Sequence, residues 1–454
     1  MTTQHSLMFG SATRDITPAY PVWLHGYSAR DRMSDGVREP VTLSCLAVSN
    51  GDLRVLVVAC DLIGIESWMC DDLAGLLERE VGIGYPQVIF ACSHTHFAPA
   101  LHWEPLDSPC VNGAEPDPRF IAAFKIALVE AARASLQSLQ AGRLQTLRLP
   151  APQVLFNRRT VCTADGLVTT NFLYPEEPAA WTFSPVDDQL TVLRVVGEAG
   201  VLAMLVNFGC HPVTGGPDRE RDTYRISSEY PHYLRQTIAE KFACPVLFTL
   251  GAAGDAVPLK RNEECRQRIG SILGNTAILG ERAYQTDVSP DLQVASVTIE
   301  GELALRTDRA AAERNYAAAR DTARRIAEAP AADHGSPDYR AAMERFQHAA
   351  MTLHRARIYP DGKQAIRLQF LRIGTTTIVA WPFEVLAGIG LRIKQRFPDV
   401  VMISCAGGYQ GYIPLAADHP RGGYEASGAA VHFVPGTGDR LLEATLRWLE
   451  QNAV

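Results

Sequence analysis

Apolar runs of strand length recur along the chain, and each one stops at a polar side chain. Five runs show this pattern: RVLVVACD (54–61), QVIFACSHTH (87–96), VLAMLVNFGCH (201–211), PVLFTLGAAGD (245–255) and TTTIVAWPFE (375–384). Strands that are apolar at successive positions are typical of sheets covered on both faces. Helical spacing of apolar residues at 119–139 and 384–397 supplies candidate covering layers. The pattern predicts an α/β fold, with a layered mixed β-sheet core flanked by helices.

Two further stretches depart from this alternation. Residues 307–358 are alanine-rich with mixed charges at helical spacing, and Pro330 and HGSP (334–337) interrupt them. We expect a helical hairpin inserted into the domain. Its charged residues form a solvated face, and a lid or the contact of a homo-oligomer are the alternatives. Residues 406–440 are rich in glycine and proline and predict a long functional loop. We find no internal sequence repeat and interpret 1–454 as one catalytic domain.

Composition narrows the class of protein. Hydrophobic residues make up 47% of the 454 positions and charged residues 20%, as in ordinary globular proteins. The net charge of −7 gives no reason to expect a nucleic acid partner. No uninterrupted apolar stretch approaches eighteen residues, so we expect no transmembrane helix. The N-terminus lacks the pattern of a signal peptide, and the ten cysteines include no C-x-x-C pair; we expect a cytoplasmic protein.

The polar ends of the runs carry the candidate chemistry. His94 and His96 are two residues apart, so in an extended segment both imidazoles would lie on one face. The two imidazoles could bind a metal, contact a substrate or have no functional partner. His211 ends another run, and Glu384 opens a predicted helix, which it could merely cap. Since ligands in α/β sheets bind beyond the carboxyl ends of strands, His94, His211 and Glu384 form a candidate zinc site.

Six motifs, in order, resemble those of the neutral (non-lysosomal) ceramidase family. They are SHTHFAP (93–99), FNRR (156–159), NFGCHP (207–212), GAAGDAVP (251–258), WPFE (381–384), and YQGY (409–412) with YE (424–425). The resemblance covers nearly the whole chain but only the catalytic domain of that family, without its C-terminal immunoglobulin-like domain. It implies a zinc-dependent hydrolase of linear amides such as ceramide, with a small-molecule or lipid amide as substrate.

The resemblance also implies roles for individual residues. One Zn²⁺ per chain would be held by His94, His211, Glu384 and Tyr412. His96 would face the zinc-bound water and the leaving group, and Tyr424 would hydrogen-bond the oxyanion. Asn157 and Arg158 of the FNRR motif would line the substrate cleft.

One position departs from the family pattern. The serine of the family's G-D-V-S-P turn, which lies at its reaction centre, corresponds here to Val257. Valine neither donates a hydrogen bond nor acts as a nucleophile, so a covalent mechanism through this position is excluded. Attack by zinc-bound water remains available. Asp255 survives in the turn, either as a turn-forming residue or as a partner that orients a histidine.

The departure leaves more than one function open. The first is hydrolysis of a ceramide-like N-acyl amide. The second is hydrolysis of a different small amide, ester or lactone. The third is a catalytically inactive, metal-stabilised binding protein. The complete ligand set, together with His96 and Tyr424, favours an enzyme.

Overall fold

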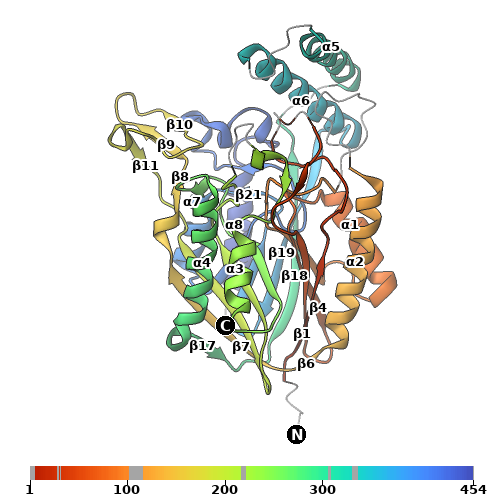
Figure 1. The fold of residues 1–454 in the computed structure, drawn as a ribbon, viewed down its shortest axis with the longest axis vertical. Coiled ribbons are helices and arrows are strands. Elements are labelled where there is room, and N and C mark those ends of the chain that lie inside the picture. The colour runs from red at the N-terminus through yellow and green to blue at the C-terminus, as the bar shows by residue number, and fades with distance from the viewer. Residues whose placement is uncertain are drawn as a thin grey trace.

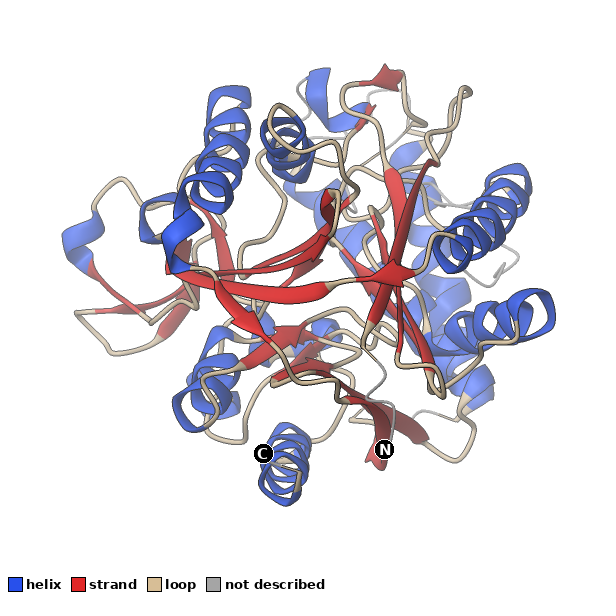
Figure 2. Cartoon of the chain, turned by 90° about the horizontal axis from the view of Figure 1, so that it is seen from below, coloured by secondary structure: helices blue, strands red, loops and turns tan. Residues whose placement is uncertain are grey.

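The computed structural model of the chain describes residues 6–27, 30, 32–101, 116–215, 221–304, 308–329 and 336–452. Strands occupy the middle of the molecule, and helices lie around them (Figure 2). The α/β class predicted from the apolar runs is therefore confirmed. No helix among the described residues is long and apolar enough to cross a bilayer.

The first third of the chain builds one sheet and two helices. In chain order these elements are β1 (Met8–Asp15), β3 (Thr42–Ser49), β4 (Arg54–Cys60), α1 (Ser67–Val81), β5 (Val88–Cys92) and α2 (Pro118–Gln137). The sheet order is β5-β4-β3-β1, with β6 (Gln140–Ala141) at its edge. Strands β1, β3 and β4 are antiparallel, whereas β4 and β5 run parallel across the α1 crossover.

The same arrangement occurs twice more. The second unit contains β7 (Arg143–Pro150), β12 (Gln189–Gly197), β13 (Gly200–Phe208), α3 (Tyr230–Ala239), β15 (Val246–Leu250) and α4 (Glu263–Leu279). The third contains β18 (Leu292–Glu302), β19 (Lys363–Ile373), β20 (Thr376–Ala380), α7 (Ala387–Arg396), β22 (Val400–Ile403) and α8 (Thr437–Gln451). Their sheet orders, β15-β13-β12-β7 and β22-β20-β19-β18, match the first in order and in strand direction. The fold is thus a threefold repetition that the sequence does not reveal.

Alternate residues of each strand enter different cores. Along β4, Val55, Val57 and Ala59 belong to a central cluster to which all three sheets contribute. The intervening residues of β4 pack instead beneath α1 and α2. The second and third sheets likewise cover their outer faces with α3 and α4, and with α7 and α8. Both faces of these three sheets are therefore covered, which is why their inner strands read as continuous apolar runs.

The segments inserted into the units differ. In the third unit, α5 (Arg309–Ala327) and α6 (Pro337–Ile358) lie between β18 and β19 and form the predicted helical hairpin, which projects at one end of the molecule (Figure 1). Its helices pack on each other through a small core of their own that includes Tyr316, Phe346 and Leu353. Ser336 caps α6, and Pro337 begins it. Pro330 and residues 334–335 of the predicted break lie outside the described residues.

Short elements complete the chain. The short strands are β2 (Gly36–Val37), β8 (Leu155–Asn157), β9 (Arg159–Cys162), β10 (Val168–Thr170), β11 (Trp181–Phe183), β14 (Arg225–Ile226), β16 (Ala256–Pro258), β17 (Gln285–Asp287), β21 (Glu384–Val385) and β23 (Tyr412–Ile413). Within 406–440, the predicted glycine-rich loop contains β23 and three 3₁₀ turns, η5 (His419–Arg421), η6 (Tyr424–Ala426) and η7 (Gly428–Ala430). The remaining 3₁₀ turns are η1 (Pro152–Val154), η2 (Pro178–Ala180), η3 (Arg221–Tyr224) and η4 (Gly280–Ala283).

Candidate functional site

The carboxyl ends of the three parallel strand pairs meet. Backbone hydrogen bonds join Cys92 N to Cys405 O at 3.2 Å and Ser404 N to Leu250 O at 2.8 Å, linking β5 to β22 and β22 to β15. One candidate ligand follows from each unit: His94 after β5, His211 after β13 and Glu384 after β20. The threefold repetition therefore brings three distant chain segments to one point.

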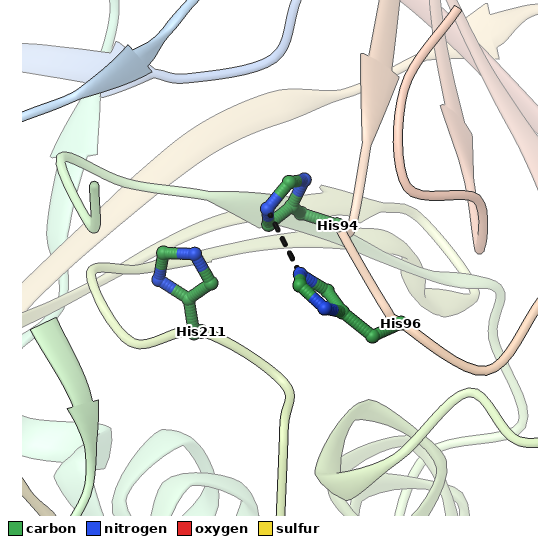
Figure 3. Close-up of side chains that lie close together, drawn as sticks. All are labelled: His94, His96 and His211. Atoms are coloured by element: carbon green, nitrogen blue, oxygen red, sulfur yellow. Dashed lines mark hydrogen bonds between the residues drawn. The ribbon is translucent and has the colours of Figure 1, made fainter. Parts of the chain in front are cut away.

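His94 does not continue its strand as the sequence led us to expect. β5 ends at Cys92, and His94 adopts a left-handed backbone conformation with φ 65°. The prediction that His94 and His96 share one extended segment is therefore wrong. The side chains converge nevertheless, with 3.3 Å between their Nε2 atoms (Figure 3). A left-handed conformation is strained for a residue with a Cβ, and such strain is common at functional sites.

Backbone carbonyls orient both predicted histidine ligands. His94 Nδ1 lies 2.6 Å from Ile63 O, and His211 Nδ1 lies 2.6 Å from Ala253 O. A carbonyl only accepts, so each Nδ1 carries a proton, and each Nε2 faces the centre of the site. This arrangement resembles the outer shell of protein metal sites, in which the second ring nitrogen of a histidine donates to a carbonyl or carboxylate.

Glu384 lies between the two histidines. Its Oε2 is 3.0 Å from His211 Nε2 and 3.2 Å from His94 Nε2. Glu384 belongs to β21 and not to the helix predicted at 384–397, because α7 begins only at Ala387. The strand β21 pairs with β23 so that Glu384 is directly opposite Tyr412, which places the side chains of these two predicted ligands on the same side of the ladder.

The electrostatics of this group favour a bound cation. Burial lowers the pKa of His211 to about 4, so its imidazole is neutral near pH 7, and its unprotonated Nε2 faces a carboxylate oxygen. Burial alone would raise the pKa of Glu384, yet the neighbouring histidines hold it well below its ordinary value. Burial lowers the pKa of His94, but Glu384 outweighs that effect and holds it well above its ordinary value, so a cation bound here would replace a proton. Two buried histidine nitrogens and one buried carboxylate form a donor set typical of zinc. The residues present therefore fit a divalent metal ion.

His96 lies beside the same point. His94, His96 and His211 each offer a ring nitrogen, and these atoms lie within 4.8 Å of one another (Figure 3). The geometry thus admits His96 as a ligand as well as in the role beside the metal that the motifs imply. Burial, reinforced by His94 and His211, lowers the pKa of His96 well below its usual value. Among the residues that the structure describes, His96 Nδ1 is buried and has no hydrogen-bond partner.

Two tyrosines flank Glu384, and the sequence drew attention to only one of them. Tyr409 donates its hydroxyl to Glu384 Oε1 at 2.6 Å, a contact that we did not predict. Tyr412, the predicted fourth ligand, accepts a hydrogen bond from Arg158 Nη2 at 2.7 Å. The sequence signal that could have identified Tyr409 was its position as the first tyrosine of the YQGY motif.

Arg158 connects the site to the glycine-rich loop. Its Nε donates to Glu425 Oε1 at 2.6 Å, and its Nη2 also donates to Gly254 O at 3.0 Å. Glu425 is wholly buried and also accepts from Thr170 Oγ1 at 2.8 Å, another role that sequence reasoning missed. Arg158 therefore fixes the orientation of the Tyr412 hydroxyl, while its contact with a substrate stays a prediction.

Asp255 and Asn157 form hydrogen bonds that hold the backbone next to the site. Asp255 Oδ1 accepts from Ala387 N at 2.7 Å, and its Oδ2 accepts from Asn157 Nδ2 at 2.9 Å. The hydrogen bonds described for its carboxylate thus reach neither histidine, and the carbonyls of Ala253 and Ala256 orient His211 instead. Burial raises the pKa of Asp255 to about 6. Asp255 ties the 251–258 turn to the start of α7.

The remaining predicted residues occupy different surroundings. Val257 is fully buried in an apolar cluster with Phe156 and Val213. Tyr424 is 48% exposed, and its ring meets that of Tyr412 edge-on at 5.5 Å between centroids. Asp61, which also ends an apolar run, forms a bidentate ion pair with Arg235, so it belongs to the scaffold.

Neither a comparison with protein-family models nor one with curated proteins finds a match. Two solved structures resemble the chain along almost all of its length. A ceramidase complexed with C2 aligns with a TM-score of 0.72 and 16% identity, over 99% of this chain and 76% of that one. The neutral ceramidase from Pseudomonas aeruginosa aligns with a TM-score of 0.71 and 17% identity, over 99% and 75%. The chain therefore has the neutral ceramidase fold, as its motifs implied.

Proposed function

We propose that this protein is a zinc-dependent hydrolase that cleaves a linear amide. The proposal rests on the convergence of three side chains, one from each repeated unit. Glu384 Oε2 lies within 3.2 Å of the Nε2 atoms of His94 and His211. The likeness to the two ceramidase structures supports an amide of the N-acyl, ceramide-like kind. In this proposal Tyr412 is the fourth ligand, because it is paired with Glu384 in the β21–β23 ladder.

Zinc held by these residues supplies a Lewis acid that polarises a carbonyl oxygen and lowers the pKa of water to about 7. The chain's own residues perform the other tasks. His96, which its low pKa keeps neutral, would first accept a proton from the attacking water and then pass that proton to the departing amine. The Tyr424 hydroxyl donates to the carbonyl oxygen under attack, on which negative charge develops. Arg158 holds Tyr412 in place through its 2.7 Å hydrogen bond.

Val257 favours a second candidate within the same class. Its side chain contributes to an apolar cluster at the position where the resembling family has a reactive serine. In this proposal the site therefore lacks one polar contact near the scissile group. A smaller amide, an ester or a lactone, which is easier to hydrolyse or needs fewer contacts, suits such a site.

A substrate screen tests the proposal. Zinc-loaded and chelator-treated protein are incubated with ceramides, shorter N-acyl amides, esters and lactones, and release of the acid is measured. We expect the zinc-loaded protein to hydrolyse at least one amide and the chelated protein to hydrolyse none. Hydrolysis that persists after complete removal of metal would contradict the proposal.

A further inference from the structure

Cys405 occupies the position in the third unit that His94 occupies in the first. Each is the second residue after the last strand of its parallel pair, β22 for Cys405 and β5 for His94. Both have a left-handed backbone conformation, with φ 49° at Cys405 and 65° at His94. Such a conformation is unfavourable for a residue with a Cβ, and it is common at functional sites. Cys405, which lies outside every ceramidase-like motif, therefore shares the local geometry of a predicted metal ligand.

The thiol of Cys405 lies beside the His94 ring. Its Sγ is 3.6 Å from His94 Nδ1, the nitrogen that donates to Ile63 O at 2.6 Å. Both Cys405 and His94 are buried. Sulfur is a weak acceptor, so the N–H group is directed mainly at the carbonyl, and the thiol packs against the same edge of the ring. Together the carbonyl and the thiol restrict the rotation of the imidazole whose Nε2 faces the site.

The backbone of Cys405 joins the chain segments of two candidate ligands. Its N–H donates at 2.8 Å to the carbonyl of Phe383, the residue before Glu384. Its own carbonyl accepts at 3.2 Å from the amide of Cys92, two residues before His94. One buried residue thus contacts the His94 ring and also fixes the backbone that carries His94 relative to the backbone that carries Glu384.

We propose that Cys405 is a positioning residue for the metal, which holds His94 Nε2 and the Glu384 carboxylate at the spacing that a divalent cation requires. The inference rests on the metal site of the proposed function. Because the sulfur contacts Nδ1, on the side of the ring away from the site, Cys405 acts through His94 and is not itself a ligand. Groups that orient metal ligands in this way raise the affinity for the metal.

Cobalt binding tests this role without requiring turnover. Co²⁺ occupies zinc sites, and its visible absorption depends on the geometry of its ligands. We expect Cys405→Ala to bind Co²⁺ about 10-fold more weakly than wild type, because sulfur is a weak acceptor and its loss falls at the lower end of outer-shell effects. The visible spectrum of the loaded variant should also differ from that of wild type. Cys405→Ser keeps an acceptor at this position, so its affinity should lie between those of wild type and Cys405→Ala.

Cys45→Ala is the matched control. Cys45 is another buried thiol of the same core, on β3, where Ala12 and Val58 are its neighbours in the adjacent strands. Both alanine variants should unfold at lower urea concentration than wild type, because each removes a buried side chain. Only Cys405→Ala should also change the Co²⁺ affinity and spectrum. Equal affinity and an identical spectrum for the two alanine variants would overturn the positioning role.

The readouts separate this inference from the proposed function. A protein that binds Co²⁺ but hydrolyses no amide when loaded with zinc would overturn the hydrolase, and the comparison of Cys405→Ala with Cys45→Ala would still decide the role of Cys405. If Cys405→Ala does not fold, Cys405→Ser decides instead. Weaker Co²⁺ binding by Cys405→Ser than by Cys45→Ala supports the positioning role, and equal binding overturns it.

Discussion

His211 Nε2 lies 3.0 Å from Glu384 Oε2, although the two residues are 173 positions apart and follow strands of different sheets. The contact exists because β13 and β20 occupy equivalent places in two copies of one topology, and both copies point their strand ends toward a common centre. With His94 from the first unit, three separate segments supply one donor each. A site built in this way depends on the whole fold, and metal binding should in turn stabilise it.

The first prediction concerns the ligands. Replacing His94 or His211 by alanine should remove the metal, because each supplies one of a few donors around the site. Elemental analysis of purified protein should give about one zinc per chain for the wild type and almost none for the variants. The exposed His348 of α6 provides the control, and His348→Ala should retain its metal.

The second prediction separates catalyst from ligand. His96→Ala should retain zinc yet lower kcat by about 10²- to 10⁴-fold, the range expected for loss of a general acid. Metal content and kcat are measured on the same preparation. Loss of zinc from this variant would instead make His96 a ligand, a role that its 3.3 Å approach to His94 also permits.

The third prediction concerns Tyr409, whose hydroxyl holds Glu384 in position. Tyr409→Phe removes that hydrogen bond without removing the ring, so zinc affinity should fall by about 10- to 100-fold, as for other outer-shell partners of metal ligands. Competition with a chromogenic chelator measures the affinity. Tyr174→Phe, which removes a hydroxyl from a half-exposed ring, is the control and should have wild-type affinity.

The fourth prediction concerns Val257. A donor in an oxyanion hole contributes about 2.7–4 kcal/mol, so Val257→Ser should raise activity on N-acyl sphingoid substrates more than on the protein's best substrate. The hydroxyl enters an apolar cluster, and urea denaturation should show a loss of about 1–3 kcal/mol. Val213→Ser perturbs the same cluster without placing a hydroxyl at residue 257. An equal gain in that variant would show that loosened packing, and not the donor, is responsible.

The local pattern of apolar and polar residues was sufficient to predict layers of strands and helices, but not their threefold arrangement. The strands were recognisable because both of their faces are buried, as Val57 and Val58 illustrate by entering opposite cores. The repetition was hidden because many apolar side chains fill equivalent positions: Cys60, Phe208 and Ala380 each end the first strand of a parallel pair.

The candidate site was predictable in its residue types and less so in its geometry. The motifs pointed to His94, His211 and Glu384, which do converge. The left-handed backbone of His94 depends on tertiary contacts, such as the 2.9 Å bond from its amide to Leu62 O, and no local pattern signals it. Glu384 was misplaced in a helix because its pairing with Tyr412 is a long-range contact. Tyr409 was overlooked for the same reason.

Anomalous diffraction at the zinc absorption edge, from crystals of the zinc-loaded protein, tests the central claim most directly. We expect one strong peak per chain, about 2.0–2.2 Å from His94 Nε2, His211 Nε2 and a carboxylate oxygen of Glu384. A zinc-loaded crystal whose anomalous peak lies elsewhere, or that has no peak between these three side chains, would contradict the account.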